Sequence, residues 1–397
     1  MLRKYLDKIK PHFQPGGKLS AFQSVFEGME TFLYTPRSTS ASGVHVHDAI
    51  DSKRVMIIVV VALLPCLLFG MYNTGYQNSL CSGVEMSFWE MMAYGFLAIL
   101  PKLVVTYVVG LGIEFAIAQV RHEEIMEGFL VTGILVPLIC PVTTPLWMLA
   151  VATAFSVIFV KEVFGGTGFN IFNVALTTRA FLFFAYPASM SGDTAFIASK
   201  PICGLGGAVT YTDAVSGATP LGQLASGADQ ITNAVGDPVS TWQAFLGLIP
   251  GSFGETSTLC VLIGGALLLL TGIASWRIML SVFAGGLFMG WIANIFGTPT
   301  YPASLLSPVD QLVYGGFAFA AVFMATDPVT AARTGIGKYI YGFLVGVIAI
   351  LIRVYNNGYP EGAMLAVLLM NALAPLIDYC VVQANVSRRM RRARSNS

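Results

Sequence analysis

The stretch from Val55 to Asn73 reads VMIIVVVALLPCLLFGMYN and contains no charged residue. A helix that crosses the apolar part of a bilayer needs roughly 20 such residues, because each residue adds about 1.5 Å along the helix axis. The rest of the chain has the same character: of its 397 residues, 55% are hydrophobic and 11% are charged. Soluble domains carry about 25% charged residues. The sequence therefore predicts a membrane protein.

Further apolar segments follow, and together they predict an all-α polytopic protein with about ten membrane-spanning helices. The second segment contains Pro101 and Lys102. We therefore expect an interruption there, with the first third of this segment at the membrane interface and the remainder in the bilayer. The third segment is short. In chain order, the predicted spans are 55–73, 88–120, 128–140, 146–160, 169–187, 259–276, 278–296, 312–326, 339–354 and 362–382.

The positions of the basic residues predict the orientation of these helices. Cytoplasmic loops carry an excess of lysine and arginine, and a cytoplasmic amino terminus satisfies this rule, whereas the opposite orientation inverts it. We therefore expect both termini in the cytoplasm and the polar connection at 188–254 on the other side. The cytoplasmic set is Lys53, Arg54, Arg121, Lys161, Arg277, Arg333, Lys338, Arg388, Arg389, Arg391, Arg392 and Arg394, and the exceptions are Lys102, Arg179, Lys200 and Arg353.

Composition argues against several other classes of protein. The net charge of +1 is not gathered into a basic patch, so no nucleic-acid partner is expected. The six cysteines include no C-x-x-C pair and predict neither a zinc nor an iron–sulfur site. Residues 1–54 lack the pattern of a signal peptide. The predicted parts are a cytoplasmic arm at 1–54, a first membrane repeat at 55–187, a non-cytoplasmic loop at 188–254, a second membrane repeat at 255–384 and a basic cytoplasmic tail at 385–397.

Two segments far apart in the chain have similar sequences. Gly128 and Phe129 lead through an apolar stretch to Cys-Pro-Val-Thr at 140–143, and Gly316 and Phe317 lead to Asp-Pro-Val-Thr at 327–330. With five predicted spans in each half, an odd number, the second copy must be inverted in the membrane. Paired short segments of this kind often mark a ligand or ion route, because broken backbone at membrane depth is tolerated only around a cavity. A chance match of Pro-Val-Thr is the alternative.

Three carboxylates, Glu114, Asp327 and Asp378, are predicted near the cytoplasmic mouth of their spans. A charged group inside a span costs at least about 2.5 kcal/mol, so each needs a partner or a function. Carboxylate oxygens could attract a cation, and Glu114 and Asp378 are the candidate ligands for Na⁺. Alternatively, these side chains reach the interface or form structural ion pairs, and Asp327 caps a turn.

Polar residues also fall in the fifth predicted span. Arg179 lies in its middle, where an arginine is more often paired with a carboxylate than used as a substrate ligand. Asn170 and Asn173 lie one turn apart at its start, so they share a face and could hydrogen-bond the polar edge of a ring. Helix capping and contacts between helices are the alternative roles for these amides.

The polar connection contains the segment Asp213–Leu221, which reads DAVSGATPL. Alone, Ser216–Thr219 is a weak motif of small residues at a turn, in which Gly217 can adopt a positive φ and Pro220 restricts the chain that follows. An ordinary polar loop is the plain alternative. In this setting the segment resembles the flavin-attachment motif of bacterial redox pumps, in which the threonine oxygen is joined to the phosphate of FMN.

Nearly the whole chain resembles the B-subunit family of the Na⁺-translocating NADH:quinone oxidoreductase and, more distantly, the D-subunit of the Rnf complex. The long polar amino-terminal arm favours the B-subunit. The motifs that carry the resemblance are KEVFGGTGFNIFN at 161–173, RAFLFFAYP at 179–187, SGAT at 216–219, FMATDPVTA at 323–331 and YPEGAMLA at 359–366.

The resemblance implies roles for individual residues. Thr219 would carry FMN through a phosphoester, beside Asp213, Ser216 and Gly217, on the outer side of the membrane. Asn170 and Asn173, with Arg179 in the same span, match the region that holds a non-covalent riboflavin. Gly110 falls in the quinone region, where inhibitors act, but Leu111 replaces the second glycine of the family's pair. Residues matching the ion path are Glu114, Phe181, Phe183, Asp327 and Asp378.

The implied function is that of a membrane subunit of a sodium-exporting respiratory NADH:ubiquinone oxidoreductase in the bacterial inner membrane. The implied partners are the other subunits of a six-subunit complex, including the flavin-carrying C-subunit and the NADH-binding F-subunit, together with a flavin transferase and the lipid bilayer. The alternatives are the Rnf homologue and a flavin-free channel or secondary transporter with the five-plus-five inverted repeat of urea channels, because a fold alone does not decide function.

Overall fold

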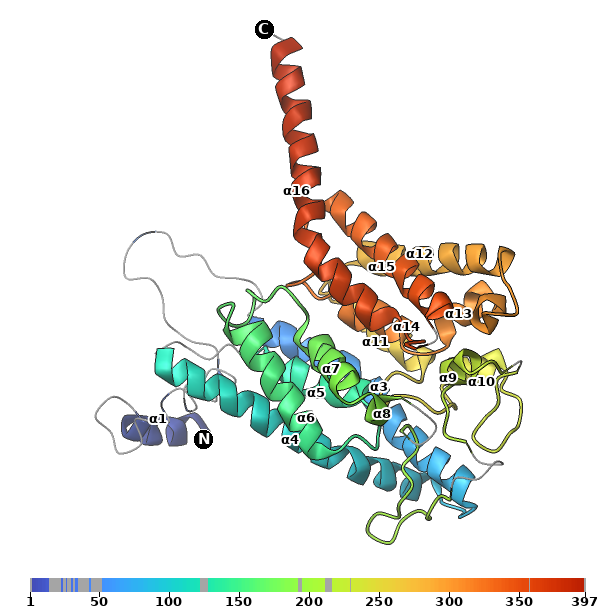
Figure 1. Ribbon diagram of the computed structural model, residues 1–397. Helices are drawn as coiled ribbons and strands as arrows, with labels where there is room; N and C mark the ends of the chain where they lie inside the picture. Colours follow the sequence, from blue (N-terminus) through green and yellow to red (C-terminus); the bar gives the residue numbers. More distant parts are fainter. Residues whose placement is uncertain are drawn as a thin grey trace.

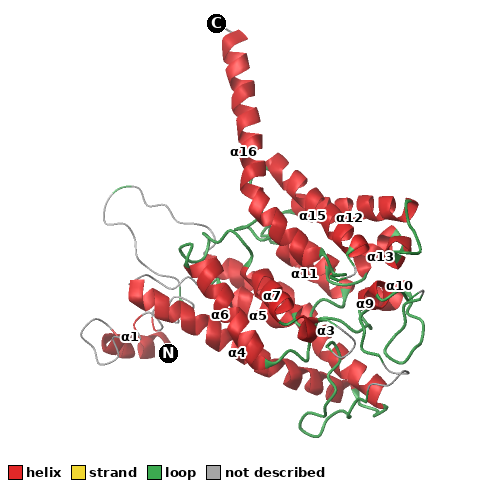
Figure 2. Cartoon of the chain, in the orientation of Figure 1, coloured by secondary structure: helices red, strands yellow, loops and turns green. Residues whose placement is uncertain are grey.

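The computed structural model describes residues 2–13, 52–121, 128–191, 195–210, 216–228, 230–356 and 358–395, with isolated positions 23, 26, 30, 33, 34 and 43. Within these residues the regular elements are helices, and the extended pairing is limited to two isolated bridges, Ile202 with Leu205 and Thr232 with Pro238 (Figure 2). The prediction of an all-α protein is confirmed for this part of the chain.

Five described helices are long and apolar enough to cross a membrane. They are α3 (Ser52–Ser82), α4 (Phe88–Arg121), α12 (Trp276–Ile295), α15 (Gly335–Tyr355) and α16 (Ala363–Ser395). Three shorter apolar helices are α5 (Phe129–Ile139), α7 (Val174–Ala185) and α11 (Thr258–Leu270). Such helices satisfy their own backbone hydrogen bonds, as an apolar solvent requires.

The remaining helical elements are shorter or irregular. Helix α6 (Leu146–Ser156) continues as the π-helix η2 (Val157–Glu162), and α14 (Phe317–Phe319) continues as the π-helix η4 (Ala320–Met324). The others are α1 (Leu2–Phe13), α8 (Pro187–Met190), α9 (Pro220–Ala225), α10 (Thr241–Leu246), η3 (Pro302–Leu305) and α13 (Pro308–Val313).

The helices form two groups that meet in a shared core. Figure 1 shows α3 to α7 in one group and α11 to α16 in the other, with the end of α16 extending away from both. Helix α3 packs against α4 and α11, and α7 packs against α6 and α16. One hydrophobic cluster, from Ala62 in α3 to Ala374 in α16, runs through both groups. The two groups therefore bury their apolar faces against each other.

The predicted interruption at Pro101 is wrong, because α4 runs unbroken from Phe88 to Arg121. The adjacent Lys102 is buried, and its ammonium donates hydrogen bonds to the carbonyl oxygens of Pro141 at 2.6 Å and Val142 at 2.5 Å. These carbonyls belong to the turn after α5. The lysine is thus satisfied by backbone dipoles inside the helix bundle.

The two similar segments have similar local structure. Helix α5 begins after Gly128, which has φ −60° and ψ −20°, and α14 begins after Gly316, which has φ −78° and ψ 15°. In both copies the helical stretch ends shortly before the turn that contains Pro-Val-Thr. They differ in that the second copy is largely π-helical.

The polar connection at 188–254 contains the short helices α9 and α10. Helices α9 and α10 pack on residues 303–314 through an apolar cluster. Its buried members are Leu221, Leu224, Ala244, Ile249, Ala303, Val313 and Tyr314. The segment that contains Thr219 is therefore anchored on the second group of helices.

Candidate functional site

Thr219 lies at the amino-terminal cap of α9. Its side-chain oxygen accepts a hydrogen bond from the backbone N–H of Gly222 at 3.1 Å, and Pro220 takes the first helical position, where a missing N–H costs nothing. Ser216 accepts from the N–H of Ala218 at 3.2 Å. Gly217 is not one of the described glycines with a positive φ, so its conformational freedom is unused here. Asp213 lies outside the described residues.

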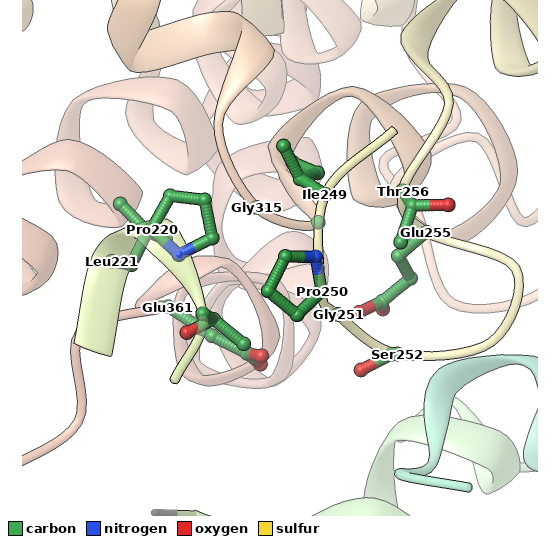
Figure 3. A pocket seen from close by; sticks show the side chains of 12 residues that line it. Pro220, Leu221, Ile249, Pro250, Gly251, Ser252, Glu255, Thr256, Gly315 and Glu361 are labelled. Atoms are coloured by element: carbon green, nitrogen blue, oxygen red, sulfur yellow. The ribbon is translucent and has the colours of Figure 1, made fainter. Parts of the chain in front are cut away.

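A pocket with a volume of about 350 Å³, part of it open solvent, adjoins Thr219. Its walls come from the start of α9, from residues 249–256 and 315–316, and from Glu361. In the close view, Pro220 and Glu361 lie to one side of Pro250, and Glu255 lies to the other (Figure 3). The partly exposed threonine therefore lies beside a pocket with two carboxylates in its wall.

Both carboxylates bind Arg179. One guanidinium nitrogen of Arg179 lies 2.7 Å and 2.9 Å from the two carboxylate oxygens of Glu255, and the other contacts Glu361 and lies 3.3 Å from the hydroxyl of Ser252. Their side chains are 5%, 9% and 20% exposed for Arg179, Glu255 and Glu361, respectively. Arg179 is thus a structural ion-pair residue, which ties α7 to two segments of the second half. Such charges are tolerable when buried only because each is paired and hydrogen-bonded.

Asn173 and Asp327 contact each other across the two halves. The Asn173 amide donates to Asp327 at 3.1 Å, and its carbonyl oxygen accepts from the N–H of Leu176 at 3.2 Å, which caps α7. Asp327 also accepts from the N–H of Val329 at 3.0 Å and from the hydroxyl of Thr330 at 3.1 Å. The capping alternatives for Asn173 and Asp327 are therefore observed. Asn170 donates to the carbonyl of Phe172 at 2.9 Å.

Asn170, Asn173 and Asp327 line a second cavity, with a volume of about 840 Å³ that includes open solvent. Its wall combines the start of α3, α5 and residues 161–174 with the end of α11 and residues 323–329. Lys161 also reaches it, and most of the remaining wall is apolar. A largely apolar cavity with a few convergent polar groups is typical of a cofactor site.

Glu114 forms a buried ion pair with Lys161, with side chains 4% and 5% exposed. The distribution of basic residues predicts Lys161 in a cytoplasmic loop, whereas in the structure its side chain is buried in the helix bundle. The second carboxylate oxygen of Glu114 has no hydrogen-bond partner among the described residues. Nearby, Arg121 donates to the carbonyl oxygen of Glu162 at 2.8 Å. The structural ion-pair alternative for Glu114 is therefore observed.

Asp378 has different partners. It accepts hydrogen bonds from the backbone N–H groups of Arg333 at 2.7 Å and Thr334 at 3.0 Å, and from the hydroxyl of Thr334 at 2.5 Å. The structure thus gives Glu114 and Asp378 separate partners. Among the described residues, no group of three or more His, Cys, Asp or Glu side chains is arranged to hold a metal ion. A sodium site at these two residues stays a prediction.

The aromatic candidates pack inside the protein. The Phe181 ring stacks on Phe155 with centroids 4.7 Å apart, and the Phe183 ring meets Tyr359 edge-on at 4.4 Å. Both are partly buried against the central core. Phe183 thus joins α7 to the segment before α16, close to Glu361.

Gly110 marks a close approach between α4 and α5. A β-carbon at this position would lie 1.9 Å from the ring of Phe129, which is fully buried. Leu111, where the family pattern has a second glycine, packs on the cluster that contains Phe129. Gly110 therefore has a role in helix packing that does not depend on a quinone site.

We expect Gly110→Ala to destabilise the protein by about 1–3 kcal/mol, because the new methyl group displaces a buried ring. Gly112→Ala is the matched control: no atom lies within 4 Å of a β-carbon there, and alanine is the better helix former. Thermal unfolding of the two purified variants measures the difference. Equal midpoints would contradict the packing role of Gly110.

Glu255, Glu361 and Ser252 were not predicted from the sequence as partners of Arg179. Glu361 belongs to the motif YPEGAMLA and directly precedes the predicted span 362–382. A carboxylate at this position was the sequence feature that could have indicated a buried partner for Arg179. Its contact with Arg179 joins residues 182 positions apart, which no local pattern reveals.

Long apolar helices, buried ion pairs and a largely apolar cavity with a few polar groups between two helical groups define an integral membrane protein with a candidate cofactor or ion site inside its core. Residues 39–387 match the family described as NQR2, RnfD, RnfE, and the chain belongs to this family.

Curated relatives align over almost their whole length. The B-subunit of the Na⁺-translocating NADH-quinone reductase of Chromohalobacter salexigens is 45% identical, with 98% of this chain and 96% of the relative covered. Proteins of the same name from Klebsiella pneumoniae and Ectopseudomonas mendocina are each 44% identical, with 98% of this chain and 99% of the relative covered.

Proposed function

We propose that this chain is the subunit of a sodium-exporting NADH:ubiquinone oxidoreductase that carries FMN on Thr219 and riboflavin near Asn170 and Asn173. The observation that carries the proposal is the cavity of about 840 Å³ that both halves line, with Asn170, Asn173 and Asp327 in its wall. The names of the aligned relatives support the complex, the quinone and the ion.

The residues present fit a riboflavin in this cavity. Asn170 and Asn173 each use one amide N–H within the protein, so the second N–H of each amide could be donated to a ligand, and Lys161 also lines the same space. The apolar remainder of the wall suits an aromatic ring. These side chains would bind and orient the flavin, while the flavin itself supplies the electron-transfer chemistry when bound.

The residues around Thr219 fit a covalent FMN. Thr219 is partly exposed, the preceding residues Ser216, Gly217 and Ala218 are small, and α9 is anchored on the second group of helices. A flavin transferase can therefore reach the oxygen, and the attached group stays close to the helix bundle. Arg179 holds the carboxylates of Glu255 and Glu361 in the wall of the adjoining pocket.

For the whole chain we propose ten spans in a five-plus-five inverted repeat, as in urea channels, with both termini on the cytoplasmic side of the bacterial inner membrane. The similar starts of α5 and α14 support the repeat. Thr219 then faces the outer side, toward the flavin-carrying C-subunit, and the NADH-binding F-subunit supplies electrons to the complex. This chain has no dinucleotide motif of its own.

Coupling to Na⁺ follows from charge balance. An electron that moves inward favours a cation that moves outward, and moving one charge against 100 mV costs about 2.3 kcal/mol. We assign the ion route to the contact between the two halves, where Phe181, Phe183 and Asp327 lie, with Glu114 and Asp378 nearer its cytoplasmic mouth. Hard carboxylate oxygens suit Na⁺.

The purified complex in sealed vesicles tests this function. Addition of NADH and ubiquinone should drive ²²Na⁺ across the membrane, and omission of quinone should stop it. Sodium flux that needs neither NADH nor quinone would identify a channel or secondary transporter. Quinone reduction at an unchanged rate without Na⁺ would contradict the coupling.

A further inference from the structure

A groove between α12 and α15 lies outside all the sites described above. It has a volume of about 830 Å³, which includes open solvent, and its walls are formed mainly by Leu280, Ala284, Ile340, Phe343 and Leu344. The one small polar residue, Ser281, donates its hydroxyl to the carbonyl of Ile278 at 2.9 Å. The groove therefore offers hydrocarbon surface to a ligand.

Two glycines bring the helices that form the groove close together. A β-carbon at Gly285 would lie 2.2 Å from the carbonyl oxygen of Phe343, and one at Gly346 would lie 2.2 Å from that of Val282. The two backbones thus approach as closely as small residues permit in membrane helix pairs. Helices α12 and α15 lie side by side (Figure 1), and the groove is lined by residues of both helices beside this contact.

The charge at one end of the groove is positive. Arg277, near the start of α12, lies 5.9 Å from the ring centroid of Tyr339, near the start of α15. Further along both helices, Gly285 meets Gly346. The two helices therefore run in the same direction, and both begin at this end. Arg277 also lies 5.8 Å from the ring centroid of Trp276. No described carboxylate lies within salt-bridge distance of Arg277. Helix starts add positive potential of their own.

Two more cations, Arg333 and Lys338, stand beside the start of α15. The acidic group at this end is Asp378, which accepts hydrogen bonds from the N–H groups of Arg333 and Thr334. Among the residues named at this end, three are cations and one is a carboxylate, and their sum is positive. Tryptophan and tyrosine typically lie at the level of lipid headgroups, so Trp276 and Tyr339 indicate that this end is at the membrane surface.

We propose that this groove binds an anionic glycerophospholipid of the surrounding bilayer, with an acyl chain along the apolar trough and the phosphate on Arg277. Guanidinium and phosphate form strong paired hydrogen bonds, and the exposed side chain of Arg277 is free to make them. The combination of a hydrocarbon trough with a basic end matches a molecule that is apolar over most of its length and anionic at one end. This site is independent of the proposed flavins.

Native mass spectrometry of the intact complex, with phosphatidylglycerol added to the micelles, tests the site. Arg277→Gln removes the phosphate partner, and Ala284→Phe fills the trough. Arg277→Gln should lower the population with bound phosphatidylglycerol roughly fivefold, because a cation near a membrane surface contributes about that factor in affinity. Ala284→Phe should also lower it, because the ring occupies the space of the acyl chain. The matched controls on α16, Arg391→Gln and Ala372→Phe, change exposed residues away from the groove and should bind like the unaltered protein.

If Arg277→Gln and Ala284→Phe bound as much phosphatidylglycerol as the two control variants, the proposal would be overturned. The proposal would also be wrong if phosphatidylcholine bound as well as phosphatidylglycerol and Arg277→Gln changed the binding of neither lipid. That result would show non-specific contact with lipid. If Ala284→Phe releases quinone but leaves phosphatidylglycerol bound, the groove holds a quinone tail. Size-exclusion chromatography of each variant confirms that the complex is intact.

Discussion

Thr219→Ala should abolish the ultraviolet-excited flavin fluorescence of this chain on a denaturing gel. The phosphoester is formed through the threonine oxygen, and alanine has no side-chain oxygen, so FMN cannot be attached at this position. The alanine also removes the hydrogen bond to Gly222, and loss of such a helix cap costs about 1 kcal/mol. A folding defect must therefore be separated from the missing attachment.

Three further variants make that separation. Thr219→Asn keeps a capping side chain without a hydroxyl and should lose the fluorescence, whereas Thr219→Ser keeps both the cap and the hydroxyl and should retain it. Ser216→Ala removes the other hydroxyl of the same segment and should leave the fluorescence unchanged. Fluorescence of the alanine or asparagine variant at the level of the native chain would exclude Thr219 as the attachment residue.

Arg179→Gln should have the largest effect on stability. It leaves Glu255 and Glu361 without their shared counter-charge, and breaking a buried ion pair in this way costs about 3–5 kcal/mol. Because both carboxylates belong to the wall of the pocket beside Thr219, the same change should also lower the flavin content of the purified chain.

The control is to remove all three charges together. Arg179→Met combined with Glu255→Gln and Glu361→Gln should recover much of the loss in unfolding temperature, since no uncompensated charge remains buried. Arg391→Gln, on the exposed end of α16, should leave that temperature unchanged. A single Arg179→Gln variant as stable as the native protein would contradict the role of this ion pair.

Apolar composition was enough to predict the helical class, and the predicted spans overlap the helices of the structure. Helix ends were less predictable: α3 continues past Asn73 to Ser82, and α16 continues to Ser395. Hydropathy reports which residues suit lipid, whereas a helix can continue into water. Pro101 removes one hydrogen-bond donor, and packing around Lys102 still keeps α4 continuous.

Local patterns identified some residues of the candidate site and missed others. Asn173 and Asp327 were predicted separately, and the structure brings them into contact. The pairing of Glu114 with Lys161, and of Arg179 with Glu255 and Glu361, could not be predicted, because each joins residues distant in the chain. A buried charge in the sequence indicates that a partner exists, but only the packing of helices shows which one.

The intact mass of this chain, purified from its native membrane, tests whether FMN is attached to Thr219. We expect a mass higher than that of the sequence by one FMN less one water, with the added mass on the peptide that contains Thr219. An unmodified mass in a chain that is otherwise intact and assembled would contradict it.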